Sequence, residues 1–304
     1  MGLSTMALTL SDWHIHFRKL APTAVVVVMA LSGALPALAK FDHSHQLFTS
    51  GLRRYVTDAQ VHYAQWQKDQ GALDSYLKQL AAISPAEYAH FTDGQKKALW
   101  INAYNALTIK VVLDHYPING TKPYYPTNSL RQIPDVWEQF HFKVAGKDVD
   151  LYTIEHEMIR KQFQDPRMHF AVVCASNGCP PILNRAYVGE TIEKDLDDAA
   201  RRYFSLSKNV QYDPDKKVVR VSRLFRWFPL DFAVAAGYTK MPFPPPSDDS
   251  IVLSYALSMA PPEIRGKFSE KDTQVNYLLF DWSLNDADAG QAKPAPDKSN
   301  PKQI

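Results

Sequence analysis

The sequence predicts an α+β fold in a single domain, with helices packed on a small and mainly antiparallel sheet. Apolar residues at three- and four-residue spacing predict several helices, whereas short alternating segments around turn residues predict hairpins. The composition supports a folded protein, because 45% of the 304 residues are hydrophobic and 22% are charged.

The first half of the domain is predicted to be helical. The segments "LFTSGLRRYV" and "LDSYLKQLAAI" have the spacing of amphipathic helices, and "QVHYAQW" between them alternates like a short strand or an extended link. The longest helix is predicted over residues 93–116, from a cap at Asp93 to a stop before Pro117. Because its middle is apolar on nearly all sides, we expect this helix to be buried at the centre.

The second half is predicted to alternate between helices and short strands. The segments "FHFKVAGKDVDL" and "VQYDPDKKVVRVS" each place two short strands around a turn and predict hairpins. "MHFAVVC", residues 168–174, predicts a buried strand, and "QVNYLLFDW" predicts the last strand. Helices are expected over residues 151–163, 191–207, 224–235 and 251–260.

The first 39 residues have the features of a secretory signal peptide. Arg18 and Lys19 precede an apolar stretch that ends in Ala37-Leu38-Ala39. An uncleaved membrane anchor is the alternative, since about 20 apolar residues can span a bilayer. We therefore predict an exported, periplasmic protein with a domain over residues 40–285 and a disordered tail over 286–304, with no membrane span once the signal is removed.

The charge pattern argues against a nucleic-acid partner. The net charge is +2, from 34 basic and 32 acidic residues, and no dense Lys/Arg run is present. Cys174, Cys179, His156 and His169 could supply four metal ligands, but they lack the spacing of zinc motifs. We therefore expect no metal, no cofactor and no nucleic acid, and the sequence leaves the partner and the substrate open.

Glu155, His156 and Arg160 stand out on the helix predicted over residues 151–163. Glu155 falls within the apolar stripe, where an unpaired carboxylate is costly to bury. His156 and Arg160 lie four residues apart and can meet each other on the adjoining face. One interpretation is a buried Glu155–Arg160 pair that supports the helix, and the other is a functional site.

Asn102 and Asn105 lie three residues apart on one face of the long central helix. A buried amide must have its donors and acceptors satisfied. The two amides therefore either bind neighbouring backbone or face a polar cleft, where they would donate to a substrate carbonyl or an oxyanion.

Cys174 and Cys179, the two cysteines of the chain, flank the turn sequence "ASNG". In an exported protein such a pair often forms a disulfide. Alternatively, Cys174 is a nucleophile that needs a base from another segment. Strand alternation places His169 and Cys174 on opposite faces, so His156 is the favoured base, with Glu155 as the group that orients it.

Five motifs resemble the bacterial and plant family named domain of unknown function 547. They are "LWINAYNALTIKVVL", "DLYTIEHEMIR", "DPRMHFAVVCASNGCPPI", "VSRLFRWFPLDF" and "YLLFDWSLN". The resemblance extends from Leu47 to Asn285, and bacterial members similar to this chain are commonly exported. It implies a domain boundary and no settled activity. Plant relatives keep a cysteine like Cys174 without one like Cys179, which implies a role for Cys174 beyond a disulfide.

The order of the elements is also similar to that of papain-like and transglutaminase-like domains, in which a buried helix is followed by a strand that carries a histidine. In those domains the helix starts with the catalytic cysteine. Here the helix offers Asn102, and Cys174 follows His169 in the chain. The likeness implies that the thiol chemistry is either lost or rebuilt around Cys174.

Two functions follow from these residues. In the first, the chain is an exported thiol-dependent hydrolase or acyl transferase, with Cys174 as nucleophile and His156, or as the less favoured choice His169, as base. The other members of this predicted site orient the base or polarise a carbonyl: Glu155, Asn102 and Asn105. In the second, a non-catalytic binding domain has a structural Cys174–Cys179 disulfide and uses Arg160 as ionic support.

Overall fold

The computed structural model describes residues 40–238, 246–269 and 271–289, which belong to one compact unit. The predicted signal peptide, residues 1–39, and residues 290–304 of the predicted tail lie outside the described residues. Within the described ranges, no helix is both long and apolar enough to cross a membrane.

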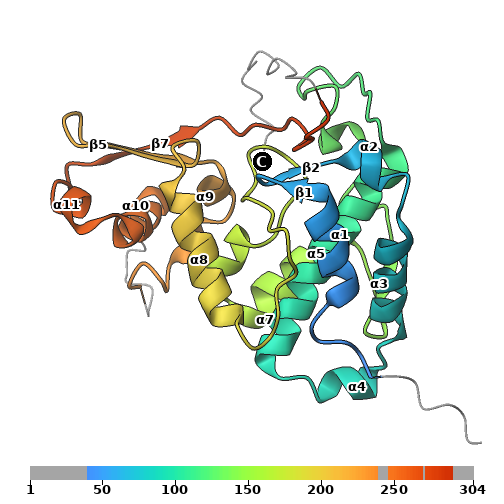
Figure 1. Ribbon diagram of the computed structural model, residues 1–304. Helices are drawn as coiled ribbons and strands as arrows, with labels where there is room; N and C mark the ends of the chain where they lie inside the picture. Colours follow the sequence, from blue (N-terminus) through green and yellow to red (C-terminus); the bar gives the residue numbers. More distant parts are fainter. Residues whose placement is uncertain (1–39, 239–245, 270, 290–304) are drawn as a thin grey trace, which may run out of the picture. The chain divides into compact units, whose positions relative to one another are not determined.

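Helix α5 (Asp93–His115) is the centre of the helical region (Figure 1). Nearly all of its residues from Ala98 to Leu113 are buried, which confirms the predicted central helix. The cap is Thr92 and not Asp93. Thr92 Oγ1 accepts the backbone N–H of Gln95, and the Gln95 side chain accepts the backbone N–H of Thr92, so the two residues form a capping box.

The elements before α5 pack around it and around one another. Helix α1 packs on α3, and both α2 and α3 contact α5. The segment "QVHYAQW" forms a short strand followed by a helical turn, so only its beginning is extended. These elements are α1 (Gln46–Tyr55), β1 (Val56–Thr57), β2 (Gln60–Val61), α2 (Tyr63–Trp66), α3 (Gly71–Ala82) and α4 (Pro85–Ala89).

The segment after α5 contains a short 3-10 helix, η1 (Leu130–Gln132), and the first predicted hairpin. Strand β3 (Phe142–Val144) pairs antiparallel with β4 (Lys147–Val149), as predicted. The following predicted helix is divided into α6 (Leu151–Thr153), the π-helix η2 (Ile154–Arg160) and α7 (Lys161–Phe163). π-helical turns are frequent at functional sites, and Glu155, His156 and Arg160 all lie in this one.

The strand predicted over residues 168–174 is wrong. Residues Pro166–Phe170 form the 3-10 helix η3, capped by Asp165, and residues 171–174 form no strand. The segment is buried as its apolar composition indicates, but its backbone partner is the Asn105 side chain and not a neighbouring strand. The alternation that separated His169 from Cys174 therefore does not apply.

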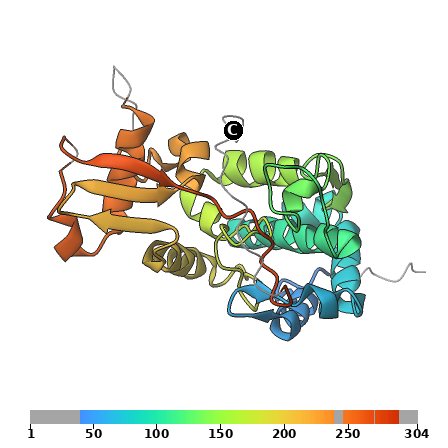
Figure 2. The same cartoon turned by 90° about the horizontal axis from the view of Figure 1, so that it is seen from above.

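A second hydrophobic core lies beside a three-stranded sheet in the C-terminal half. Strand β5 (Val210–Asp213) is antiparallel to β6 (Val218–Ser222), which is parallel to β7 (Gln274–Leu278) (Figure 2). Three of the four strand pairs among the described strands are antiparallel, so the α+β prediction is confirmed. The accompanying helices are α8 (Ile192–Ser205), α9 (Leu224–Trp227), η4 (Pro229–Phe232), α10 (Asp248–Met259) and α11 (Pro262–Arg265).

The C-terminal segment, defined here as residues 279–289, runs from β7 to the helical region (Figure 2). The backbone N–H of Val61 donates to Asn285 O at 2.9 Å, and the Tyr116 hydroxyl donates to Asp286 Oδ2 at 2.9 Å. Asp286, which the sequence placed in the tail, is therefore bonded to the domain. Phe280 and Trp282 of this segment line a cavity whose other walls include residues of α5 and η2.

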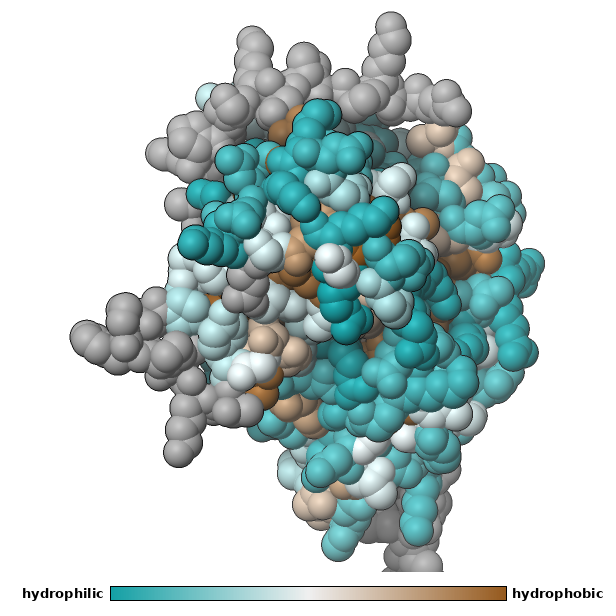
Figure 3. All heavy atoms as spheres, turned by 90° about the vertical axis from the view of Figure 1, so that its left-hand side faces the viewer, coloured by the Kyte–Doolittle hydropathy of each residue, from teal (hydrophilic) through white to brown (hydrophobic). Residues whose placement is uncertain are grey.

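The outer face of the C-terminal half offers no large apolar surface in the view of Figure 3. The side chains of α10, α11 and the three-stranded sheet are mostly hydrophilic there, with small, separated apolar patches. The residues that carry chemistry gather instead in the interior, beneath the C-terminal segment.

Candidate functional site

A cavity of about 490 Å³ lies where the C-terminal segment, the π-helix η2 and the cysteine loop meet. Cys174, Glu155 and His156, three members of the predicted site, line this cavity together with His169. Its wall is otherwise largely aromatic, with Tyr104, Tyr125, Trp137, Tyr152, Trp227, Phe228, Phe280 and Trp282. A second cavity of about 460 Å³ shares Glu155, His156 and His169 with the first.

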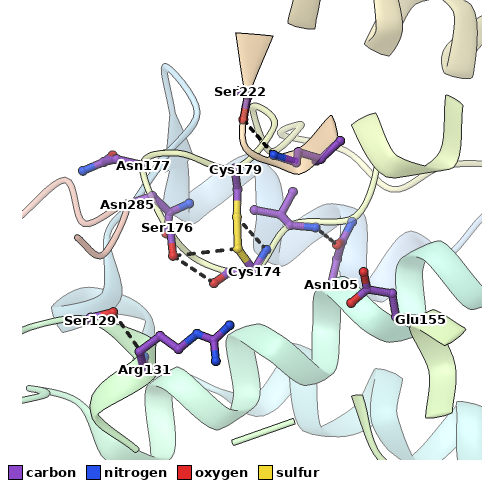
Figure 4. Close-up of a disulfide and its surroundings, with 12 residues drawn as sticks. Asn105, Ser129, Arg131, Glu155, Cys174, Ser176, Asn177, Cys179, Ser222 and Asn285 are labelled. Atoms are coloured by element: carbon purple, nitrogen blue, oxygen red, sulfur yellow. Dashed lines mark hydrogen bonds between the residues drawn. A yellow bond between two sulfur atoms is a disulfide. The ribbon is translucent and has the colours of Figure 1, made fainter. Parts of the chain in front are cut away.

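The predicted disulfide between Cys174 and Cys179 is present (Figure 4). Cys179 is only 4% exposed, whereas Cys174 is half-buried. The backbone N–H of Cys174 donates to Cys179 Sγ at 3.1 Å. Both cysteines line the cavity, and Cys174 is the more exposed residue of the pair.

The C-terminal segment holds the turn between the cysteines. The backbone N–H of Gly178 donates to Asp281 O at 2.8 Å, and that of Asn177 donates to Ser283 O at 2.8 Å. A Cβ at position 178 would lie 2.9 Å from the Asp281 nitrogen, so the close approach requires glycine. The loop between the cysteines is thus hydrogen-bonded to the same segment that supplies Phe280 and Trp282 to the cavity wall.

Asn102 and Asn105 do not line the cavity, because each amide binds backbone. The Asn102 Nδ2 donates to Tyr187 O at 2.8 Å, and its Oδ1 accepts the Tyr187 N–H at 2.9 Å. The Asn105 Nδ2 donates to Ala171 O at 3.0 Å, and its Oδ1 accepts the Val173 N–H at 2.8 Å. Of the two interpretations of these amides, the geometry supports backbone binding, and Asn105 positions the segment that ends at Cys174.

Arg160 and His169 share one carboxylate, that of Asp231. Arg160 Nε and Nη2 donate to Asp231 Oδ2 and Oδ1 at 2.5 and 3.0 Å, and His169 Nε2 lies 2.7 Å from Oδ2. Burial raises the pKa of Asp231, but the hydrogen bonds from His169 and Arg160 outweigh it and hold that pKa well below its usual range. A carboxylate only accepts, so His169 Nε2 is the donor of this bond and Nδ1 is the other nitrogen of the ring.

His156 has the opposite arrangement. Arg160 Nη1 lies 2.5 Å from His156 Nδ1, and because a guanidinium only donates, Nδ1 must accept. Burial lowers the pKa of His156 by more than nearby Glu155 raises it, so the ring is neutral with its proton on Nε2. The two histidines therefore differ in their partners: His156 binds the Arg160 guanidinium through Nδ1, and His169 binds the Asp231 carboxylate through Nε2.

The predicted Glu155–Arg160 pair is wrong. Arg160 instead takes the bidentate partner Asp231, which lies far along the chain in η4. Glu155 Oε2 accepts the Tyr104 hydroxyl at 3.2 Å, and the Trp137 indole N–H donates to that hydroxyl at 3.4 Å. Glu155 is thus hydrogen-bonded to Tyr104, another residue that lines the cavity, and is not the ion-pair partner of Arg160.

Three residues of this site were not singled out as functional from the sequence. Arg131 is a single charged residue in a short helical turn, where no periodicity or motif marks it, whereas Asp231 lies in the quoted motif "VSRLFRWFPLDF", which is the available signal for it. Trp282 also lies in a quoted motif, the last of the five, which is the available signal for it.

Comparison with known families gives one match. Residues 88–204 match the model of the family described as "Protein of unknown function, DUF547". The chain carries a DUF547 region. This region contains α5, the π-helix η2 and the cysteine loop, whereas the motifs quoted after residue 204 lie beyond the match. No curated protein and no solved structure matches the chain.

The side chains of the site do not form a metal centre. Across residues 40–238, 246–269 and 271–289, no group of three or more His, Cys, Asp or Glu side chains is arranged to hold a metal ion. What the site offers is a sulfur, a histidine with its carboxylate, and aromatic walls.

Proposed function

We propose that this chain is a thiol-dependent hydrolase or acyl transferase whose nucleophile, Cys174, is stored as a disulfide with Cys179. One observation carries the proposal: Cys174 opens onto the same cavity as His169, which already has Asp231 as its orienting carboxylate. His169 replaces His156 as the base, because His156 Nδ1 is occupied by Arg160.

The disulfide must be reduced before the thiol can act. A dithiol reductant attacks one sulfur of the pair, and its second thiol resolves the mixed disulfide, so that two electrons pass to Cys174 and Cys179 and the reductant leaves as its disulfide. His169 Nδ1 then accepts the Cys174 proton, and the thiolate attacks a substrate carbonyl. The leaving group departs with that proton, and water or another acceptor takes the acyl group and regenerates the thiol.

Stoichiometric acetylation by p-nitrophenyl acetate tests this proposal without knowledge of the natural substrate. We expect intact-mass analysis of the dithiol-reduced protein to show one acetyl group on Cys174, and the oxidised protein and the Cys174→Ala variant to show none. His169→Gln should slow the acetylation, whereas His156→Gln should have a smaller effect. Acetylation no faster than that of the urea-unfolded, reduced protein would contradict the proposal.

The closed disulfide favours one alternative, a non-catalytic binding domain braced by Cys174–Cys179. A periplasmic location, which the N-terminal sequence predicts, would keep such a bond oxidised. In that case the cavity binds its ligand equally well before and after reduction, and the reduced protein shows no selective acetylation at Cys174.

A further inference from the structure

Arg131 differs from the other partly buried arginines near the centre of the chain. Arg160, Arg167 and Arg185 each pair with a carboxylate. Among the residues that the structure describes, no such ion pair involves Arg131, and its buried Nε has no hydrogen-bond partner. Glu138 and Glu155 act on Arg131 electrostatically, but a buried N–H group without a hydrogen-bond acceptor is still costly, so this position calls for an explanation.

Two tryptophan rings, nearly perpendicular to each other, lie beside the Arg131 guanidinium. Its central carbon lies 4.3 Å from the ring centroid of Trp137 and 4.5 Å from that of Trp282. Tyr125 is the third ring near it, at 5.7 Å. Aromatic rings around a guanidinium restrict its side chain without using its N–H groups, which can then bind an anion through two parallel hydrogen bonds.

Arg131 lines the cavity together with the disulfide. In Figure 4 its side chain and that of Glu155 come from different elements and point toward the space beside Cys174. The volume of about 490 Å³ is in the range that holds a small organic ligand, and the aromatic walls suit an apolar body.

The acidic residues of the cavity restrict the charge of the ligand. Glu138 and Glu155 also line it, and the Tyr104 hydroxyl is the group that Glu155 binds. Arg226 lines the cavity as well, so two arginines face two carboxylates, and this balance suits a singly charged carboxylate better than a doubly charged phosphate.

We infer that Arg131, which contacts the rings of Trp137 and Trp282, binds the carboxylate of a small monoanionic ligand whose apolar or aromatic body fills the cavity. Together with the proposed thiol chemistry, on which this extension rests, the substrate is then an acyl compound that carries a free carboxylate. The binding itself does not depend on a reduced Cys174.

Isothermal titration of the oxidised full chain tests this inference, with N-acetyl-L-phenylalanine as the probe. Its carboxamide analogue and inorganic phosphate are the comparison ligands. We expect the acid to bind about tenfold or more tightly than the amide, because the charge-assisted pair is lost in the amide. Phosphate should bind more weakly than the acid.

Variants of Arg131 identify the binding group. Arg131→Gln should weaken binding of the acid about tenfold or more and leave binding of the amide unchanged. Arg131→Lys keeps the charge but not the fork, so it should give an intermediate loss, and it is the deciding variant if Arg131→Gln does not fold. Arg53→Gln, which removes an equal charge from exposed α1, is the matched control and should bind like the natural chain.

Several results would overturn the inference: no binding of the acid, equal binding of acid and amide, unchanged binding in both Arg131 variants, or tighter binding of phosphate. The two proposals fail separately. Carboxylate binding without acetylation of Cys174 leaves the inference standing and removes the enzyme, whereas acetylation without carboxylate binding does the reverse.

Discussion

Replacement of Asn105 by alanine should detach the segment that carries Cys174 from helix α5. The variant leaves Ala171 O and the Val173 N–H without the partners that now lie at 3.0 and 2.8 Å. Each buried backbone group left unpaired costs about 1–3 kcal/mol, so the two together cost about 2–6 kcal/mol. Because water can enter the space left by the amide, we expect a loss near the lower end, about 3 kcal/mol.

The assay is urea unfolding of the oxidised protein, followed by far-UV circular dichroism. Asn102→Ala is the matched control, since it removes the same two kinds of bond from the same helix but at Tyr187. Both variants should lose similar stability, and only Asn105→Ala should speed reduction of the disulfide by a dithiol. A loss below about 1 kcal/mol for Asn105→Ala, or equal reduction rates in the two variants, would refute this reasoning.

Two further predictions concern Asp231 and Gly178. The pKa of Asp231 is lower in the folded protein than in the unfolded chain, where an aspartate has a pKa of about 3.9. The ion pairs of Asp231 therefore stabilise the fold at pH values above about 3.9, and this stabilisation is lost as the pH falls through the lower pKa of the folded state. Asp231→Asn should therefore cost about 2 kcal/mol near neutral pH, and the difference from the natural chain should shrink by up to about 1.4 kcal/mol per pH unit below about pH 4. A difference that stays constant through acid pH in urea unfolding would contradict the assignment. Gly178→Ala should cost about 1–3 kcal/mol, because the added Cβ would meet the backbone of Asp281, and Gly266→Ala, whose Cβ has ordinary contacts, should cost far less in the same unfolding measurement. Equal losses in the two glycine variants would show that the close approach at position 178 is not tight.

Local patterns predicted much of the fold. The apolar sequence around Trp100 is enough to place α5 at the centre, and turn residues mark the hairpins at Gly146 and Pro214 correctly. The segment 168–174 was mistaken for a strand, because an apolar run looks the same whether its backbone binds a strand or a side chain such as Asn105.

The candidate site was predictable in part. Cys174, His156 and Glu155 were named from the sequence, and all three line one cavity. The contact of Arg160 with His156 Nδ1 is local and agrees with their predicted four-residue spacing, whereas the carboxylate beside His169 comes from Asp231, 62 residues away. Asp231 contacts His169, and Arg131 contacts Trp282, through long-range packing, and no spacing in the chain encodes these two contacts.

The pH dependence of Cys174 alkylation by iodoacetamide tests the central claim most directly. The Cys179→Ser variant leaves Cys174 as the one thiol, and the serine oxygen can still accept the Cys174 N–H. We predict an apparent thiol pKa clearly below the ordinary value of about 8.5, which returns toward that value in the double variant with His169→Gln. A pKa near about 8.5 in Cys179→Ser, unchanged by His169→Gln, would contradict the claim that Cys174 and His169 form a catalytic pair.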